Sequence, residues 1–183
     1  MEALFIVAGI LAVLFLWVML AYNGLVGARN YCDTAWSGID VQLKRRHDLV
    51  PNLVATVRGY AQHEAQLFES VARARAEALR ARTPESLGRA EGALQGAIGH
   101  VFALKESYPQ LRADRAFQEL QEQLADTEDK VQAARRIYNG NVRDYRTRLQ
   151  SFPTVLVARW FGFEDRQFFE IEEPVEREAP RVG

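Results

Sequence analysis

The feature that most constrains this chain is an uncharged apolar run at its start, Ala3 to Ala21. As an α-helix these nineteen residues extend roughly 28 Å, at ~1.5 Å each, close to the ~30 Å hydrocarbon core of a bilayer. A segment that stays in lipid must be helical, because lipid offers no partner to backbone N–H and C=O groups. Trp17 and Tyr22 lie toward the end of the run, where amphipathic rings favour the membrane interface. The run therefore predicts a transmembrane anchor over residues 1–22 that contacts the lipid bilayer through residues 3–21.

A cleaved signal peptide is the competing interpretation of this run. It requires a basic n-region and a small-residue cleavage site. The chain begins with Met1-Glu2, and the stretch from Met19 to Gly24 has no A-x-A pattern. Both observations favour a retained anchor.

The charges that flank the run predict its orientation. No Lys or Arg precedes it, whereas Arg29 and Lys44-Arg45-Arg46 follow it. The positive-inside rule then places the N-terminus outside and the rest of the chain in the cytoplasm. The cytoplasm is a reducing compartment, which suits the single Cys32, interpreted as an ordinary packed thiol.

The three consecutive basic residues are interpreted as solvated charges or salt-bridge partners of a neighbouring helix. A lipid-binding role is disfavoured, because roughly 30 Å of helix separates them from the bilayer and charges are screened over about 8 Å.

Apolar residues recur at helical spacing through most of the remaining chain, and proline is rare, so the fold class is all-α. Asp48 is the expected N-cap and Pro51 the expected first-turn residue of a second helix. The breaks at Thr83-Pro84 and Tyr108-Pro109 separate the second, third and fourth expected helices. The expected helices cover 23–47, 51–82, 85–106 and 112–150. The clearest pattern is a heptad seam in the last one, formed by Phe117, Leu120, Leu124, Thr127, Val131, Ala134 and Tyr138.

Short connections between these helices favour antiparallel neighbours. The predicted architecture is an N-terminal transmembrane helix followed by an antiparallel up-and-down four-helix bundle over residues 23–163. The alternative joins the first two helices into one kinked rod of roughly 90 Å, which the third helix is too short to cover. Residues 164–183 are acidic and contain two prolines, so they are predicted to form a disordered tail.

Two further features leave alternatives open. In the bundle, the last helix returns toward the bilayer, so Trp160, Phe161 and Phe163 form a candidate interface segment, although capping of the bundle core is favoured. Gly88, Gly92 and Gly96 recur every four residues. They indicate either close helix–helix approach or a weak helix.

Sequence signatures of catalysis are absent. There is no P-loop, G-x-G-x-x-G or G-x-S-x-G motif, and Leu67 stands where the second histidine of an H-E-x-x-H site would follow His63-Glu64. The three histidines lack the Glu-x-x-His pattern of di-iron bundles. No catalytic, cofactor-binding or metal-binding residue is therefore assigned, and no enzyme activity is expected. The net charge of −1 gives no reason to expect nucleic acid.

The stretch from Trp36 to Val54, WSGIDVQLKRRHDLVPNLV, resembles the signature of the LemA family. The similarity runs from Tyr22 to about Phe169, and Arg146 departs from the family pattern, where asparagine is expected. The resemblance implies a single-pass inner-membrane protein with a short outer N-terminus and a helical bundle, without a defined activity. Similar proteins include one that takes part in building magnetosome membranes, and others are linked with membrane metalloproteases.

Polar residues near the first predicted hairpin and on the last helix are expected to meet in the antiparallel bundle. They form a candidate interaction or structural cluster, for which a structural role is favoured: Arg46, Asp48, Asn52, Arg135, Tyr138 and Asn139. The predicted function is a non-enzymatic membrane-anchored scaffold or adaptor. Its candidate partners are proteins, a membrane protease among them, or further copies of itself. The alternative is a membrane-remodelling or oligomerising protein that acts on the bilayer.

Overall fold

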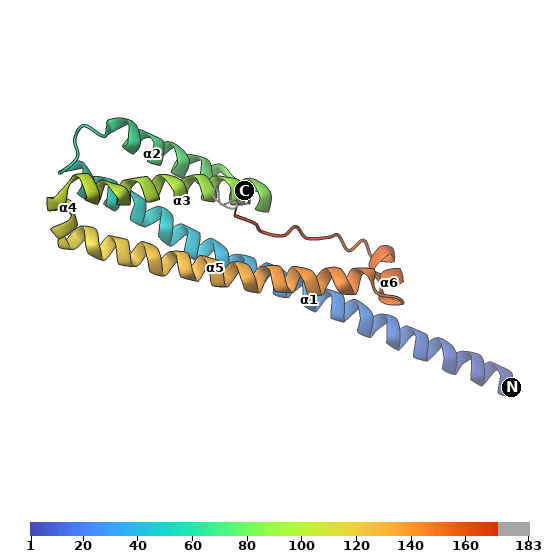
Figure 1. The fold of residues 1–183 in the computed structure, drawn as a ribbon. Coiled ribbons are helices and arrows are strands. Elements are labelled where there is room, and N and C mark those ends of the chain that lie inside the picture. Colours follow the sequence, from blue (N-terminus) through green and yellow to red (C-terminus); the bar gives the residue numbers. More distant parts are fainter. Residues whose placement is uncertain (172–183) are drawn as a thin grey trace, which may run out of the picture. The chain divides into compact units, whose positions relative to one another are not determined.

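The computed structural model describes residues 1–171, and helices dominate this range (Figure 1). No strand occurs among these described residues, which confirms the all-α fold class. The helices are α1 (Glu2–Arg58), α2 (Ala65–Arg80), α3 (Pro84–Ser107), α4 (Pro109–Ala113), α5 (Arg115–Gln150) and α6 (Thr154–Trp160).

The chain divides into two compact units, which are described separately. The anchor unit comprises Met1–Ser37 and Arg136–Gln167. The central unit comprises Gly38–Arg135 and, among the described residues, 168–171.

Helix α1 continues through Pro51, so the predicted break at Asp48–Pro51 is wrong. Proline has no N–H and leaves the carbonyl four residues earlier, that of His47, without its helical partner. Arg75 on α2 supplies the missing donor, with its Nε 2.8 Å from the His47 oxygen. The two helices expected over 23–47 and 51–82 are therefore replaced by one continuous α1 and a shorter α2, and Asp48 is not an N-cap.

The turn between α1 and α2 is fixed by its own backbone and by one side chain. The Tyr60 and Ala61 N–H groups donate to the Val57 carbonyl at 2.9 and 3.0 Å. The Tyr60 hydroxyl donates to Asp114 at 2.6 Å, and Asp114 also accepts from the Phe117 N–H at 2.8 Å at the start of α5. These bonds to the carboxylate, the Tyr60 bond first, lower the pKa of Asp114.

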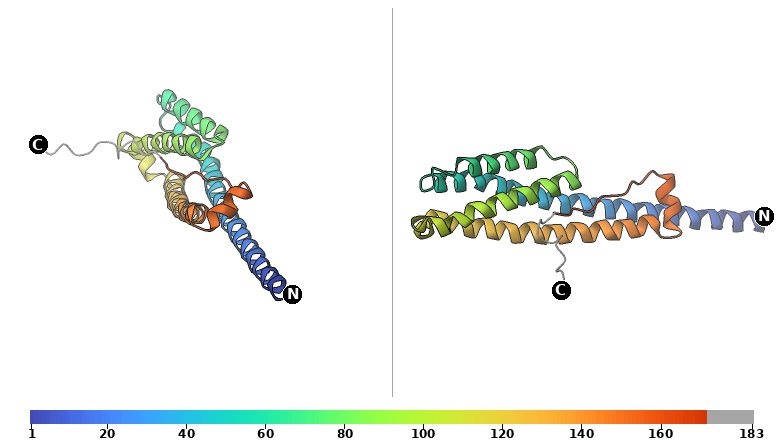
Figure 2. Two further views of the ribbon diagram at one scale, coloured as in Figure 1. Left: turned by 90° about the vertical axis from the view of Figure 1, so that its right-hand side faces the viewer. Right: turned by 45° about the horizontal axis from the view of Figure 1, so that its top comes forward.

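The breaks predicted at Thr83-Pro84 and Tyr108-Pro109 are confirmed. Thr83 and Ser86 form a capping box at the start of α3, with Pro84 in the first turn. Helix α3 ends at Ser107, before the second proline. Figures 1 and 2 show α2 and α3 side by side and running in opposite directions.

One apolar core occupies the central unit, and α1, α2, α3 and α5 all contribute to it. Its most deeply buried members include Leu53, Val71, Leu94, Val101 and Phe117. The predicted heptad seam of α5 is buried at every position except Ala134, which is half-buried. The antiparallel four-helix bundle stays a prediction, with its first two helices corrected as above.

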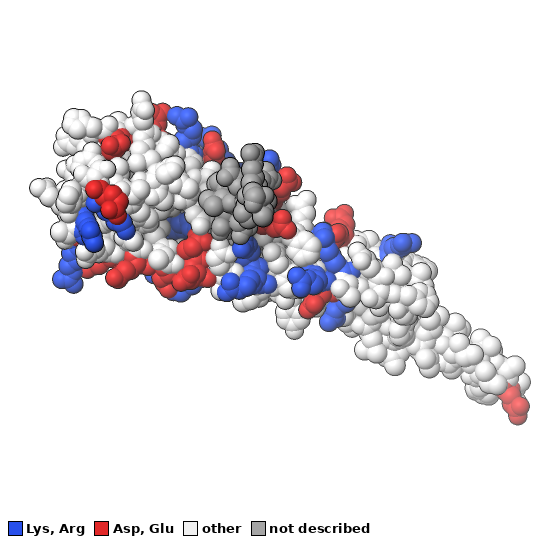
Figure 3. Space-filling model, in the orientation of Figure 1, with Lys and Arg blue, Asp and Glu red and all other residues white. Residues whose placement is uncertain are grey.

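The anchor unit contains the apolar start of α1. This helix includes an 18-residue window of mean hydropathy 2.9 with none of its residues buried, which is long and apolar enough to cross a membrane. Figure 3 shows this end of the molecule almost without charged residues. Beyond it, Leu25 and Cys32 of α1 and Val142 and Tyr145 of α5 are buried.

The chain after α6 differs from the predicted disordered tail. Residues 164–171 follow a defined non-helical path, and Phe169 and Ile171 are buried. Gly88 makes room for this path, because a Cβ at that position would lie 1.8 Å from the Glu170 carbonyl oxygen. Close approach at Gly88 is thus to a non-helical segment, whereas a Cβ at Gly96 would meet nothing within 4 Å. The prediction for 172–183 lies outside the described residues.

Candidate functional site

Buried charges meet inside the central unit. Arg46 on α1 is 2% exposed and Glu91 on α3 is fully buried, and Arg46 Nη1 lies 3.0 Å from Glu91 Oε2. The other Glu91 oxygen lies 2.6 Å from Nε2 of buried His47. A second nitrogen of Arg46 pairs with Glu128 on α5, which is partly exposed. We call these four residues the ion cluster.

The helical periodicity positions the ion cluster. Arg46 lies on the buried stripe of α1 between Leu43 and Val50, and Glu91 lies on that of α3 between Leu87 and Leu94. Neither charge can reach bulk water from such a position, so each must find a partner inside the core. The cluster satisfies both Glu91 oxygens and joins three helices through Arg46.

The buried charges of the ion cluster depend on one another. Removal of two charges from water costs several kcal/mol, which their attraction offsets only with good geometry and further hydrogen bonds. A mispaired helix register would leave Arg46 or Glu91 buried alone. The expected salt bridge from the Lys44-Arg45-Arg46 run to neighbouring helices is confirmed, at Arg46 and at the exposed Arg45–Asp126 pair of 3.6 Å.

A hollow of about 260 Å³ lies beside the ion cluster. Arg46, Gln95, Phe102 and Glu128 are among its lining residues. The buried Gln95 Oε1 has no hydrogen-bond partner among the described residues, so this wall can accept a bond from water or from a donor on another molecule.

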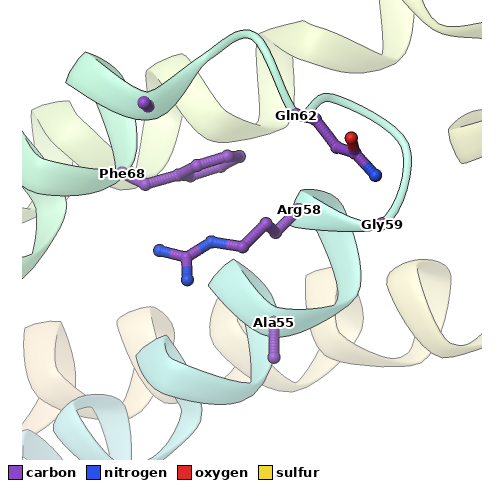
Figure 4. A pocket seen from close by; sticks show the side chains of 6 residues that line it. Ala55, Arg58, Gly59, Gln62 and Phe68 are labelled. Carbon is purple, nitrogen blue, oxygen red and sulfur yellow. The ribbon is translucent and has the colours of Figure 1, made fainter.

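A second hollow, of about 500 Å³, opens at the turn between α1 and α2. Figure 4 shows the Arg58 side chain extended alongside the Phe68 ring, with Gln62 on the opposite wall. The Arg58 guanidinium carbon lies 5.6 Å from the ring centroid, a cation–π distance. These residues form a shallow surface feature without an acid–base pair.

The polar cluster predicted from the sequence is divided between the two units. Arg46 belongs to the ion cluster, Asp48 and Asn52 are exposed, and Arg135 is half-buried, all in the central unit. Tyr138 and Asn139 belong to the anchor unit, where the Tyr138 hydroxyl donates to the Gln167 carbonyl at 2.8 Å. The structure therefore pairs Arg46 and Tyr138 with residues that the prediction did not name.

Two tyrosines of α5 hold the returning chain in the anchor unit. Besides Tyr138, the buried Tyr145 donates its hydroxyl to the Glu164 carbonyl at 3.0 Å. Burial raises the pKa of both phenols, so they remain donors at neutral pH. Arg146, the departure from the family pattern, also contacts this segment through Asp165 at 2.7 Å.

Cys32 lies in the anchor unit and is buried. Burial raises the pKa of its thiol, which keeps it protonated and unreactive. This placement agrees with its interpretation as a packed thiol.

The predicted interface residues lie on and after α6, against the end of the apolar run. Tyr22 contacts the rings of Phe161 and Phe163, with centroids 4.9 and 5.5 Å apart. Helix α6 ends in a Schellman motif, in which Gly162 adopts φ 67° and the Phe163 N–H donates to Ala158 at 2.9 Å. This left-handed residue turns the chain so that Phe163 meets Tyr22, whereas Trp160 is 87% exposed.

Glu91, His47 and Glu128 are the site residues that the sequence analysis missed. Glu91 carries a signal, because it is the single charge on the apolar stripe of α3, and Arg46 is its counterpart on α1. His47 lies outside the strict stripe and Glu128 is partly exposed, so neither is distinguished by periodicity. No group of three or more His, Cys, Asp or Glu able to hold a metal occurs within residues 1–171.

These features define an all-helical protein whose first helix begins in a segment able to cross a membrane and ends in an ion-paired core. The LemA family model matches residues 35–183, so the chain belongs to the LemA family.

Curated relatives of this chain are magnetosome proteins. Magnetosome protein MamQ of Magnetospirillum gryphiswaldense is 21% identical in an alignment 178 residues long that covers 83% of this chain and 65% of the relative. Magnetosome proteins MamQ 1 and MamQ 2 of Paramagnetospirillum magneticum are each 22% identical in an alignment 196 residues long that covers 92% of this chain and 72% of the relative. These relatives and the apolar helix together indicate a membrane-associated protein.

Proposed function

We propose that this chain is a single-pass, membrane-anchored scaffold that presents a helical surface to protein partners. The observation that carries the proposal is the continuity of α1 across 57 residues, from the uncharged run into the core of the central unit. An uninterrupted helix joins the lipid-facing segment to the folded part without a flexible linker. We also propose that the helices form an antiparallel four-helix bundle and that the protein has no catalytic activity.

Basic residues near the end of the apolar run support an orientation with the N-terminus outside the inner membrane. Arg29 follows the run, and Arg148 donates to the Gly24 carbonyl at 3.3 Å, which adds a second positive charge at this level. The positive-inside rule then assigns the bundle to the cytoplasm.

Exposed apolar side chains on the central unit are the proposed contact points for a partner, either a membrane protein such as a protease or a second copy of this chain. Val41 on α1 is 63% exposed and Leu79 on α2 is 47% exposed. The buried charges of the ion cluster are already paired with one another, which supports a structural role for them over acid–base catalysis.

The test is site-specific photocrosslinking in intact membranes of the native host. A photoreactive amino acid replaces Val41, Leu79 or, as a surface control, Glu85 on α3. We expect a discrete cross-linked protein product from Val41 or Leu79 that is absent from Glu85. A chain that yields no protein adduct at either apolar position would contradict the scaffold.

Membrane remodelling is the second candidate function, and the exposed aromatic residues on and beside α6, Trp160 and Phe161, favour it. The test compares the shape of vesicles that contain the full chain with that of vesicles that contain the Trp160→Asp variant, by electron cryo-microscopy. Tubulation or constriction by the parent chain alone would support it, and unchanged spherical vesicles would reject it.

A further inference from the structure

Four large apolar side chains on and beside α6 are exposed. Phe152 is 81% exposed, Leu156 55%, Trp160 87% and Phe161 51%. Leu156 and Trp160 are four residues apart and so share one face of the helix. The neighbouring Val157 and Ala158 are buried, so α6 packs on one face and leaves its bulkier face open.

The position of this face along α1 is fixed by direct contacts. Tyr22, the first residue after the uncharged run, packs edge-on against Phe161 with ring centroids 4.9 Å apart. Phe163 packs on the same tyrosine, and Arg29 lies over the Phe163 ring at 5.6 Å. Helix α6 is thereby held at the level where the apolar run ends.

A bilayer surface can cover the exposed apolar face of α6. Tryptophan and tyrosine rings favour the zone between hydrocarbon and water, where their apolar bodies are covered and their polar atoms stay hydrated. Arg148, which bonds to Gly24, and the exposed Arg159 beside Trp160 supply positive charge at the same level. Basic side chains at this level attract anionic lipid head groups.

We propose that α6 lies in the interface of the membrane that α1 crosses, with Leu156, Trp160 and Phe161 inserted among the lipid head groups. This inference rests on the membrane anchoring in the proposed function. It gives the protein a second lipid contact, 138 residues after Tyr22 at Trp160, and it fixes the rotation of the anchor unit about α1 by making one side of it face the bilayer.

The three tryptophans of the chain allow a direct test. The full chain is reconstituted into phosphatidylcholine–phosphatidylglycerol vesicles as three variants, each with one tryptophan. W17F/W36F leaves Trp160, W36F/W160F leaves Trp17, and W17F/W160F leaves Trp36, whose ring contacts Tyr138. Quenching by acyl-chain-brominated lipid and by aqueous iodide is measured for each.

We expect brominated lipid to quench Trp160 severalfold more strongly than Trp36, with iodide less effective on Trp160 than on free tryptophan. In the Trp160 variant, Leu156→Asp lowers the quenching by brominated lipid, whereas Ile137→Asp, at an exposed isoleucine of α5, does not change it.

Trp17 separates the failure of this inference from the failure of the anchor. If brominated lipid quenches Trp17 but leaves Trp160 open to iodide, α6 is not interfacial and the anchor stands. If Trp160 is shielded from iodide without quenching by lipid, protein covers the face and the inference is wrong. If Trp17 is not quenched either, the membrane anchoring itself is wrong.

Discussion

The central unit and the anchor unit satisfy their buried polar groups in different ways. In the central unit, Arg46 and Glu91 pair between regular helices. In the anchor unit, the hydroxyls of Tyr138 and Tyr145 donate to backbone carbonyls of a non-helical segment. Charge pairs determine which helical faces meet, whereas phenols fix the path of a chain whose own side chains carry no periodic pattern.

The largest effect is expected where the central unit depends on charge. Glu91→Ala leaves Arg46 and His47 buried without their shared partner, which should lower the free energy of unfolding by about 3–5 kcal/mol. Urea unfolding of the full chain in mild detergent, followed by circular dichroism, measures this loss. The control is Glu85→Ala on the same helix, an exposed residue 3.6 Å from Arg89, with an expected change under about 0.5 kcal/mol.

A double variant sharpens this prediction. Arg46→Met with Glu91→Leu replaces the buried pair by apolar side chains and should be more stable than Glu91→Ala alone. If the double variant loses as much free energy of unfolding as Arg46→Met and Glu91→Leu lose in total when made singly, the desolvation argument for the ion cluster fails.

The next effect concerns the proline inside α1. Arg75→Ala removes the donor to the His47 carbonyl and should cost about 1.5–3 kcal/mol, the range for hydrogen bonds from charged groups. In a Pro51→Ala background the restored N–H of residue 51 donates to the His47 carbonyl, so Arg75→Ala should lower the free energy of unfolding by less. Arg73→Ala, an exposed neighbour on α2, is the control. An equal loss in both backgrounds would show that Arg75 does not compensate for the proline.

Two glycines of α3 should respond with opposite signs. Gly88→Ala places a Cβ against the Glu170 backbone and should destabilise by about 1–3 kcal/mol, the usual range for overpacking. Gly96→Ala meets nothing within 4 Å and should stabilise by roughly 0.5–1 kcal/mol through helix propensity. Thermal unfolding of both variants measures the difference, and two changes of the same sign would contradict the path of residues 168–171.

The smallest effect is expected in the anchor unit. Tyr145→Phe keeps the ring and removes one hydrogen bond to a neutral carbonyl, which is worth about 0.5–1.5 kcal/mol. Trypsin cleavage after Arg166 should accelerate about fivefold for each 1 kcal/mol lost, if local opening precedes cleavage. Tyr31→Phe, at a 69% exposed ring, is the control. A loss as large as that of Glu91→Ala would remove the contrast between the two units.

The sequence predicted the parts of the fold that follow from periodicity. The all-α class, the breaks at Thr83-Pro84 and Tyr108-Pro109 and the buried seam of α5 all follow from local patterns. The break at Pro51 was wrong because its compensation is not local. The donor that rescues the helix is Arg75, on a different helix.

The site was predictable only where a charge interrupts an apolar stripe. Arg46 and Glu91 each do so, and a search for opposite charges on buried stripes would have found them together. The path of residues 164–171 was not predictable, since it is held through its own backbone carbonyls, which accept from the Tyr138 and Tyr145 hydroxyls, and through the space beside Gly88. Nothing in an acidic segment indicates that Phe169 is buried.

The long sequence separation between the two parts of the anchor unit has a consequence for synthesis of the protein. Contacts such as Asn141 to Tyr31 and Arg148 to Gly24 join residues that are 110 and 124 positions apart. A ribosome that adds ~5–20 residues per second needs roughly 6–25 s between them. During that interval Leu25 and Cys32 of the nascent chain, which are buried in the folded protein, have no α5 to cover them.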